Sequence, residues 1–258
     1  MQELTHWFET DSGQALLAWE QHQMDALVAD VFGYHAIQLG LPLLKALRVN
    51  RMPLRVFVAP QDTAAQCKQA GLAQVDARFD ALPFASQSLD LIVLPHTLEY
   101  AADPYATLRE AERVLIPEGR LIIAGFNPWS LWSAQRLLGL DRHTPPRELE
   151  SISVARLKDW LRLLSFDIDE GAFGLYAPAC SRAWQPRWEW LNKTGERVWP
   201  VLGSAYCLCA IKRVNGMRLI GPKPNWKKMR RGMRRRPVAV ASRAPAGPTF
   251  KRDPEAHE

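Results

Sequence analysis

Apolar and polar positions follow two periods along the chain, one typical of helices and one typical of buried strands. Over residues 14–32 apolar side chains return every three or four positions, which predicts an amphipathic helix that ends at Gly33. Short apolar runs bounded by Gly, Pro or charged residues predict strands. We expect these strands at residues 35–39, 54–58, 73–79, 89–94, 120–124, 166–175 and 204–213.

The segments between the strands favour helices. Asp103 and Ser153 are typical N-cap residues, and Pro104 suits the first position of a helix. Strands that alternate with helices predict an α/β fold, in which a seven-stranded, mostly parallel sheet has helices on both faces. The helices are expected at residues 43–49, 63–69, 104–115, 128–139 and 153–164.

Composition places the chain among ordinary globular proteins. Hydrophobic residues make up 47% of its 258 residues and charged residues 23%. No run approaches the roughly 18 apolar residues of a membrane-spanning helix, and the N-terminus lacks the pattern of a signal peptide. The four cysteines (Cys67, Cys180, Cys207 and Cys209) are too few and too scattered for a disulfide framework. We therefore expect a cytoplasmic protein without a transmembrane segment.

The net charge of +6 is unevenly distributed. Residues 212–258 hold 14 Lys/Arg and 3 Asp/Glu, whereas the rest of the chain holds 19 and 24. We expect residues 214–258 to form a basic tail that is disordered in isolation. Its stretch 223–236 could contact nucleic acid or an anionic lipid surface weakly, and a solvated basic extension is the alternative.

In a parallel sheet, ligands bind where the carboxyl ends of strands meet. Functional residues are therefore expected in the loops at residues 40–42, 59–62, 79–84, 95–99 and 125–132. We expect no metal site, because the histidines lack ligand spacing. Cys207 and Cys209 would also point to opposite faces of a strand.

Three motifs stand out along the middle of the chain. They are Asp80-Ala-Leu-Pro-Phe84 followed by Ser88–Val93, His96-Thr-Leu-Glu99 followed by Asp103–Leu115, and Pro117-Glu-Gly-Arg-Leu121. In this order and at this spacing they resemble the class I S-adenosylmethionine (SAM)-dependent methyltransferases of the type 11 branch. The resemblance implies a Rossmann-like fold whose last strand is antiparallel, SAM as the cofactor, and a methyl acceptor as the partner.

The resemblance implies where the cofactor binds. Gly40 would let the backbone pass close to the methionine part of the cofactor. Asp80 and Ala81 would lie on either side of the adenine, and Leu82 would pack near its ring. Pro95 and His96 would lie next to the transferred methyl group. His96 could act as a general base, or it could hydrogen-bond the cofactor or a backbone carbonyl.

The sequence departs from the family pattern at the first two strands. Gln38 stands where the family has an acidic residue, and Pro42 and Leu44 replace two glycines of the glycine-rich loop. The acidic residue that would bind the ribose is Ala59, although Asp62 lies close by. Gln38 and Asp62 are therefore candidates to compensate in cofactor binding.

Other residues near the expected site have two interpretations each. Glu99 could orient His96, but we expect it to pair with Arg109 or Arg113. On the substrate side the candidates are Asn127, Trp129 and Trp132, whose alternative role is a helix start with two core tryptophans.

We thus expect an N-terminal helical segment (1–34), a methyltransferase-like domain (35–213) and the basic tail. A tryptophan-rich insertion at residues 184–200 either covers the last strands or forms a lid over the substrate. The leading hypothesis is a SAM-dependent methyltransferase with an unidentified acceptor. The alternative is a non-catalytic relative that serves as a binding protein, with a decayed cofactor loop and a polyanion contact through its tail.

Overall fold

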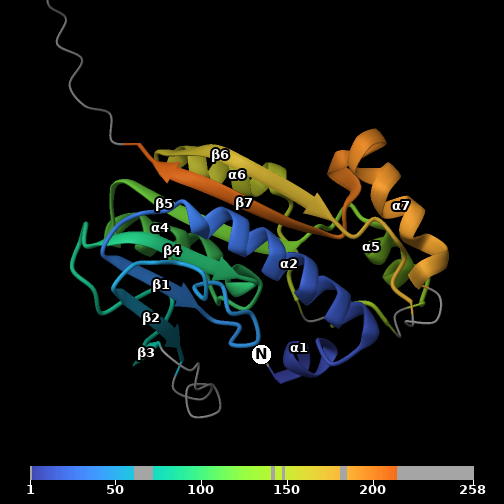
Figure 1. Ribbon diagram of the computed structural model, residues 1–258, viewed down its shortest axis with the longest axis horizontal. Coiled ribbons are helices and arrows are strands. Elements are labelled where there is room, and N and C mark those ends of the chain that lie inside the picture. Colours follow the sequence, from blue (N-terminus) through green and yellow to red (C-terminus); the bar gives the residue numbers. More distant parts are fainter. Residues whose placement is uncertain (1, 61–71, 141–142, 147–148, 181–184, 214–258) are drawn as a thin grey trace, which may run out of the picture. The chain divides into compact units, whose positions relative to one another are not determined.

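A seven-stranded sheet organises the molecule, with strand order β3-β2-β1-β4-β5-β7-β6 (Figure 1). The structure is a computed structural model that describes residues 2–60, 72–140, 143–146, 149–180 and 185–213. The expected helix at 63–69, Asp62 and the basic tail lie outside these residues. The strands are β1 (His35–Leu39), β2 (Leu54–Ala59), β3 (Ala73–Asp76), β4 (Leu89–Pro95), β5 (Leu115–Phe126), β6 (Phe166–Gly174) and β7 (Ala205–Lys212).

The direction of the strands confirms the expected mostly parallel sheet. Strands β1 to β5 run parallel to their neighbours, and β7 is antiparallel to both β5 and β6. The strand order runs outward from β1 in both directions, to β2 and β3 on one side and to β4 and β5 on the other, so the topological switch point lies between β1 and β4. The carboxyl ends of β1 and β4 therefore flank the place where this class of sheet binds ligands.

Several helices begin at a side-chain cap. Thr10, Asp103, Ser130 and Ser153 each accept a hydrogen bond from the backbone N–H three residues on, which satisfies a free donor of the first turn. The helical elements are α1 (Gln2–Trp7), α2 (Asp11–Ala29), η1 (Thr97–Glu99), α4 (Pro104–Val114), α5 (Leu131–Leu137), α6 (Val154–Leu163), α7 (Gln185–Val198) and η3 (Pro200–Leu202).

The expected helix at 43–49 is wrong, because the segment forms turns. The buried amide of Gln38 holds its backbone, donating to the carbonyls of Leu41 and Leu44 and accepting from the N–H of Ala46. These bonds tie the loop to β1 in place of the helical pattern.

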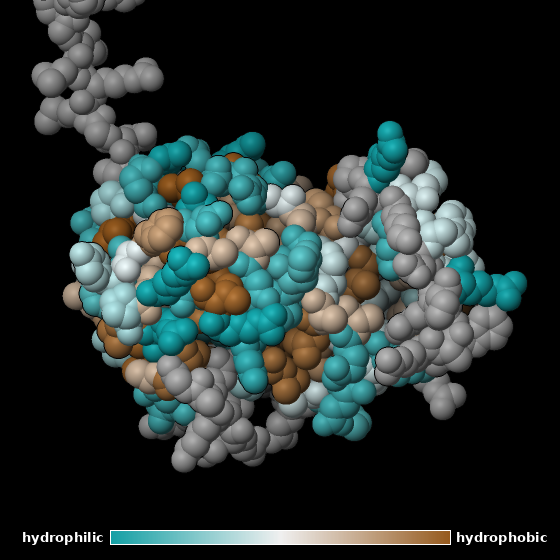
Figure 2. All heavy atoms as spheres, in the orientation of Figure 1, coloured by the Kyte–Doolittle hydropathy of each residue, from teal (hydrophilic) through white to brown (hydrophobic). Residues whose placement is uncertain are grey.

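The two faces of the sheet have separate cores, so the helices cover both faces as expected. Helix α2 buries Leu16, Met24 and Val28 against one face, together with residues of α1. Helices α4 and α6 bury Leu108 and Leu161 against the other. On the face drawn in Figure 2, hydrophilic and hydrophobic residues are interspersed. Among the described helices, none is both long and apolar enough to cross a membrane.

Candidate functional site

A pocket of about 370 Å³ opens beyond the carboxyl ends of β2, β3 and β4. Pro60 comes directly after β2, and the segments that follow β3 and β4 supply the other walls. The lining residues are Pro60, Arg78, Phe79, Asp80, Tyr100, Ala101, Ala102, Asp103 and Thr107. The pocket thus brings together residues from three loops at the edge where the sequence predicts function.

Two aspartates, Asp80 and Asp103, line this pocket, and Asp80 is paired with an arginine. Its two carboxylate oxygens accept hydrogen bonds from Arg78, from Nε at 2.9 Å and from a terminal nitrogen at 2.6 Å. The Arg78 hydrogen bonds lower the pKa of Asp80, so the carboxylate stays ionised at neutral pH. The Arg78 side chain is 78% exposed, so it can turn into solvent and leave Asp80 to a ligand.

Tyr100 is a pocket residue that the sequence did not indicate. Its hydroxyl is buried and has no hydrogen-bond partner in the structure. Burial, with the charges of Glu99 and Glu3, raises the pKa of Tyr100, so the hydroxyl keeps its proton. Because the hydroxyl is closed to solvent, other atoms of Tyr100 line the pocket. Tyr100 comes directly after the motif that ends at Glu99, and no pattern in the sequence marks it as a site residue.

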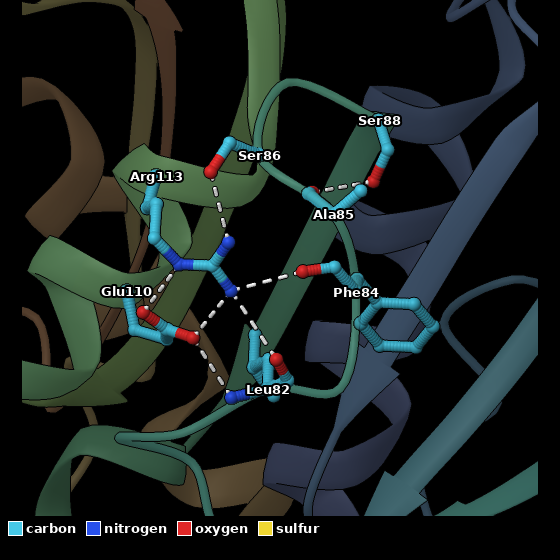
Figure 3. A network of polar contacts seen from close by, with 7 residues as sticks. All are labelled: Leu82, Phe84, Ala85, Ser86, Ser88, Glu110 and Arg113. Carbon is cyan, nitrogen blue, oxygen red and sulfur yellow. Dashed lines mark hydrogen bonds and ion pairs between the residues drawn. The ribbon is translucent and has the colours of Figure 1, made fainter.

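Helix α4 fixes the loop that carries Asp80 and Leu82 (Figure 3). Arg113 donates to the carbonyls of Leu82 at 3.2 Å and Phe84 at 3.0 Å, and Glu110 accepts from the N–H of Leu82 at 2.9 Å. Arg113 and Glu110 also pair with each other at 2.7 Å. Two of the three motifs are therefore joined by this network, which sets the position of the pocket wall.

Gly40 is the glycine that remains at the end of β1, where the related family has a glycine-rich loop. Gly40 has φ +72°, which favours glycine, and a Cβ there would lie 3.3 Å from Thr97 Oγ1 and 3.5 Å from the Phe79 ring. Gln38 is fully buried, and both polar atoms of its amide are bonded to the loop after β1. In this structure Gln38 supports the loop and does not face the pocket.

His96 lies in a buried carboxylate cluster at the end of β4. Its Nε2 is 2.8 Å from Glu20 Oε1 on α2, and its Nδ1 is 2.8 Å from Glu99 Oε2. Burial opposes the charged imidazole, but Glu20 and Glu99 outweigh this and raise the pKa of His96 to about 10. A protonated ring with both nitrogens engaged cannot accept a proton, so this geometry does not support a general base.

The expected pairing of Glu99 with Arg109 or Arg113 is wrong. Glu99 is buried and orients His96 with one oxygen, while its other oxygen accepts from the N–H of Phe126 at 2.5 Å. Arg113 is bound to Glu110 instead. The i to i+3 spacing places His96 and Glu99 on the same short turn, which outweighs the pairing with a helix further along the chain.

Aromatic side chains of the N-terminus close the space beside His96. Phe8 is fully buried 5.8 Å from the His96 ring, and Trp7 packs edge-on to Phe126 at 5.6 Å and to Trp132 at 5.8 Å. Pro95, the last residue of β4, is buried nearby. The side of the site where the acceptor was expected is thus occupied by the chain's own N-terminal segment.

The candidate substrate residues are placed in different environments. Asn127 is buried and donates to the carbonyls of Val201 at 2.7 Å and Gly203 at 2.9 Å, which ties β5 to the segment before β7. Trp132 is a core residue whose indole N–H donates to the Ala177 carbonyl. Trp129 is 72% exposed. Ala81, whose N–H donates to the Arg78 carbonyl, and Leu82 follow Asp80 in the same loop, but neither is among the residues that line the pocket.

Comparison with known proteins agrees with the motifs. Residues 56–123 match the family model of the type 11 methyltransferase domain. The uncharacterized protein YafS of Escherichia coli is 34% identical over 148 residues, which cover 57% of this chain and 59% of YafS. The uncharacterized protein Rv2003c of Mycobacterium tuberculosis is 26% identical over 151 residues, covering 58% and 47%. The match therefore spans only about half to three-fifths of the length of these relatives.

Solved structures share the fold at low sequence identity. A methyltransferase from Haloferax volcanii, solved with the Trm112 methyltransferase activator, has a TM-score of 0.58 at 20% identity, covering 83% of this chain and 98% of its own. A Thermotoga maritima SAM-dependent methyltransferase, described as a possible histamine N-methyltransferase, has a TM-score of 0.55 at 16% identity, covering 81% and 99%. Residues 56–123 thus match a methyltransferase domain model, and the sheet has the Rossmann-like fold of the class I methyltransferases.

Proposed function

We propose that the protein is a SAM-dependent methyltransferase that holds its cofactor in the pocket beyond β2, β3 and β4. The observation that carries this proposal is the pocket itself, which the ionised Asp80, Phe79 and Tyr100 line beyond the carboxyl ends of β2, β3 and β4. The acceptor is unidentified, and the fold does not decide among acceptors.

The residues of the pocket fit the adenosine part of the cofactor. The Asp80 carboxylate would accept hydrogen bonds from an exocyclic amine, and the Phe79 ring offers an apolar surface for a base. Gly40 leaves room at the end of β1, where a side chain would crowd Thr97 and Phe79. When bound, SAM supplies an activated methyl group on a sulfonium.

Methyl transfer requires mainly placement and the exclusion of water. The buried cluster of Trp7, Phe8 and Phe126 provides an apolar wall next to His96. We propose that His96 is a positioning residue, because its ring holds Glu20 of α2 to the turn after β4. An acceptor that reaches this region has to displace α1 or enter beside it.

A specific observation favours the second candidate, a non-catalytic binding protein. Gln38 replaces the family's acidic residue, and its side-chain amide donates to carbonyls of the loop after β1. The N-terminal segment also occupies the side of the site where an acceptor would bind. Such a protein would bind the cofactor or a related nucleoside weakly and transfer no methyl group.

Titration with S-adenosylhomocysteine by calorimetry separates the two. We expect the full-length protein to bind this product with a micromolar dissociation constant, because its adenosine part is that of SAM. If neither SAM nor its product binds at millimolar concentration, the proposed function is wrong.

A further inference from the structure

Exposed hydrophobic side chains gather beyond the carboxyl ends of the parallel strands. Among the described residues, 15 large hydrophobic side chains are exposed, and nine of them fall within residues 129–140 and 190–202. Leu137 is 88% exposed, Leu138 76%, Trp129 72% and Trp199 58%. Single exposed apolar residues are ordinary, but a concentration of this kind marks an interaction surface. We call residues 129–140 and 190–202 the apolar end surface.

The helices of both segments bond to the same stretch of backbone, residues 176–179. On α5, the Gln135 side chain bonds both backbone groups of Ala179. On α7, Asn192 accepts from the N–H groups of Tyr176 and Ala177. Asn127 bridges to the Val201 carbonyl at 2.7 Å. Figure 1 shows α5 and α7 at the same end of the sheet.

The composition of the surface fits a lipid bilayer. Trp129, Trp190 and Trp199 are exposed alongside leucines, and tryptophan favours the boundary between water and lipid. By sequence, residues 129–140 and 190–202 carry three Lys/Arg against one Glu, and residues 214–258 carry 12 Lys/Arg against three Asp/Glu. An apolar contact combined with a polybasic segment is the pairing that gives stable attachment to anionic membranes. A second copy of the chain is disfavoured, because it would bring like charges together.

We propose that the apolar end surface docks on an anionic lipid bilayer. The surface lies at the edge of the sheet that follows β5, next to Asn127 and Trp132. Docking would therefore turn the acceptor side of the site toward the membrane, and the acceptor would be an apolar or amphipathic molecule dissolved in lipid. This last consequence rests on the proposed function, whereas docking itself does not.

Sedimentation of the full-length protein with vesicles tests the proposal without any cofactor. We expect binding to vesicles of phosphatidylserine and phosphatidylcholine, and much weaker binding to phosphatidylcholine alone. Leu137→Ser with Leu138→Ser should weaken the partition coefficient at least tenfold, because two apolar side chains no longer enter the lipid. Leu163→Ser is the matched control, since this α6 leucine is 73% exposed outside the surface.

Three outcomes would overturn docking. The first is no binding to anionic vesicles. The second is binding that the double substitution leaves unchanged, which would assign the contact to the basic tail alone. The third is binding of a single-stranded RNA in place of vesicles, measured in parallel. Circular dichroism of each variant confirms that it folds. Because calorimetry with S-adenosylhomocysteine is done without lipid, failure here leaves the cofactor proposal standing, and the reverse also holds.

Discussion

Replacing His96 by alanine is expected to lower the free energy of unfolding by about 3–5 kcal/mol, the largest stability loss that we expect from a single substitution. The reason is that Glu20 and Glu99, both buried, would lose the cation that lies between them at 2.8 Å from each. Equilibrium urea denaturation measures the effect.

His35→Ala serves as the control for this substitution. The His35 side chain is 46% exposed and lies 4.0 Å from Asp90, so its loss should change stability by about 0.5 kcal/mol or less. A loss below about 1 kcal/mol for His96→Ala would show that the cluster does not hold α2 to the turn after β4.

The same cluster predicts a pH signature. The pKa of His96 is raised to about 10, above its ordinary value near 6.5, so the folded state binds one more proton between these values. The stabilisation is complete below about pH 6.5 and is lost as the pH rises toward 10. Between pH 7 and 9 the free energy of unfolding of the wild type should fall by up to about 1.4 kcal/mol per pH unit. This slope should be absent in His96→Ala.

Replacing Asp80 by alanine is expected to weaken the binding of S-adenosylhomocysteine by about 10- to 150-fold. A hydrogen bond to a charged group contributes about 1.5–3 kcal/mol, and each 1.4 kcal/mol corresponds to a factor of ten. Asp80 lines the pocket, and its exposed partner Arg78 can give way to a ligand. Calorimetric titration of the variant measures the change.

Asp167→Ala is the matched control for Asp80→Ala. It also removes an aspartate side chain, but from β6, which lies at the opposite edge of the sheet from β3. The Asp167 side chain is 75% exposed there. This control should bind the ligand as the wild type does. Equal affinity for all three proteins would mean that the adenine does not lie against Asp80.

The strands were predictable because each apolar run between turn residues has one local interpretation. The predicted strand at 89–94 and the observed β4 (Leu89–Pro95) differ by one residue, and the first strand has the predicted bounds. The helix at 43–49 was wrong because the buried side chain of Gln38, on the preceding strand, satisfies the backbone of the loop. Local patterns contain no information on such contacts.

The candidate site was predictable only in part, for the same reason. The motifs place Asp80 at the pocket, where the structure also has it. The ion pair of His96 with Glu20 joins residues 76 positions apart, and nothing in the helical pattern of α2 marks Glu20 as its partner. Burial of Phe8 beside His96 likewise depends on how α1 folds back onto the sheet. Tertiary packing, which the sequence pattern does not encode locally, therefore decides the role of His96.

Amide chemical shifts of the isotope-labelled protein, recorded with and without S-adenosylhomocysteine, test most directly whether this pocket holds the cofactor. The account predicts the largest changes at Gly40, at Phe79 to Leu82 and at Tyr100 to Ala102, where the end of β1 and the pocket walls lie. The exposed edge strand β6 should show none. An unchanged spectrum at millimolar ligand, or changes confined to residues away from these loops, would contradict the account.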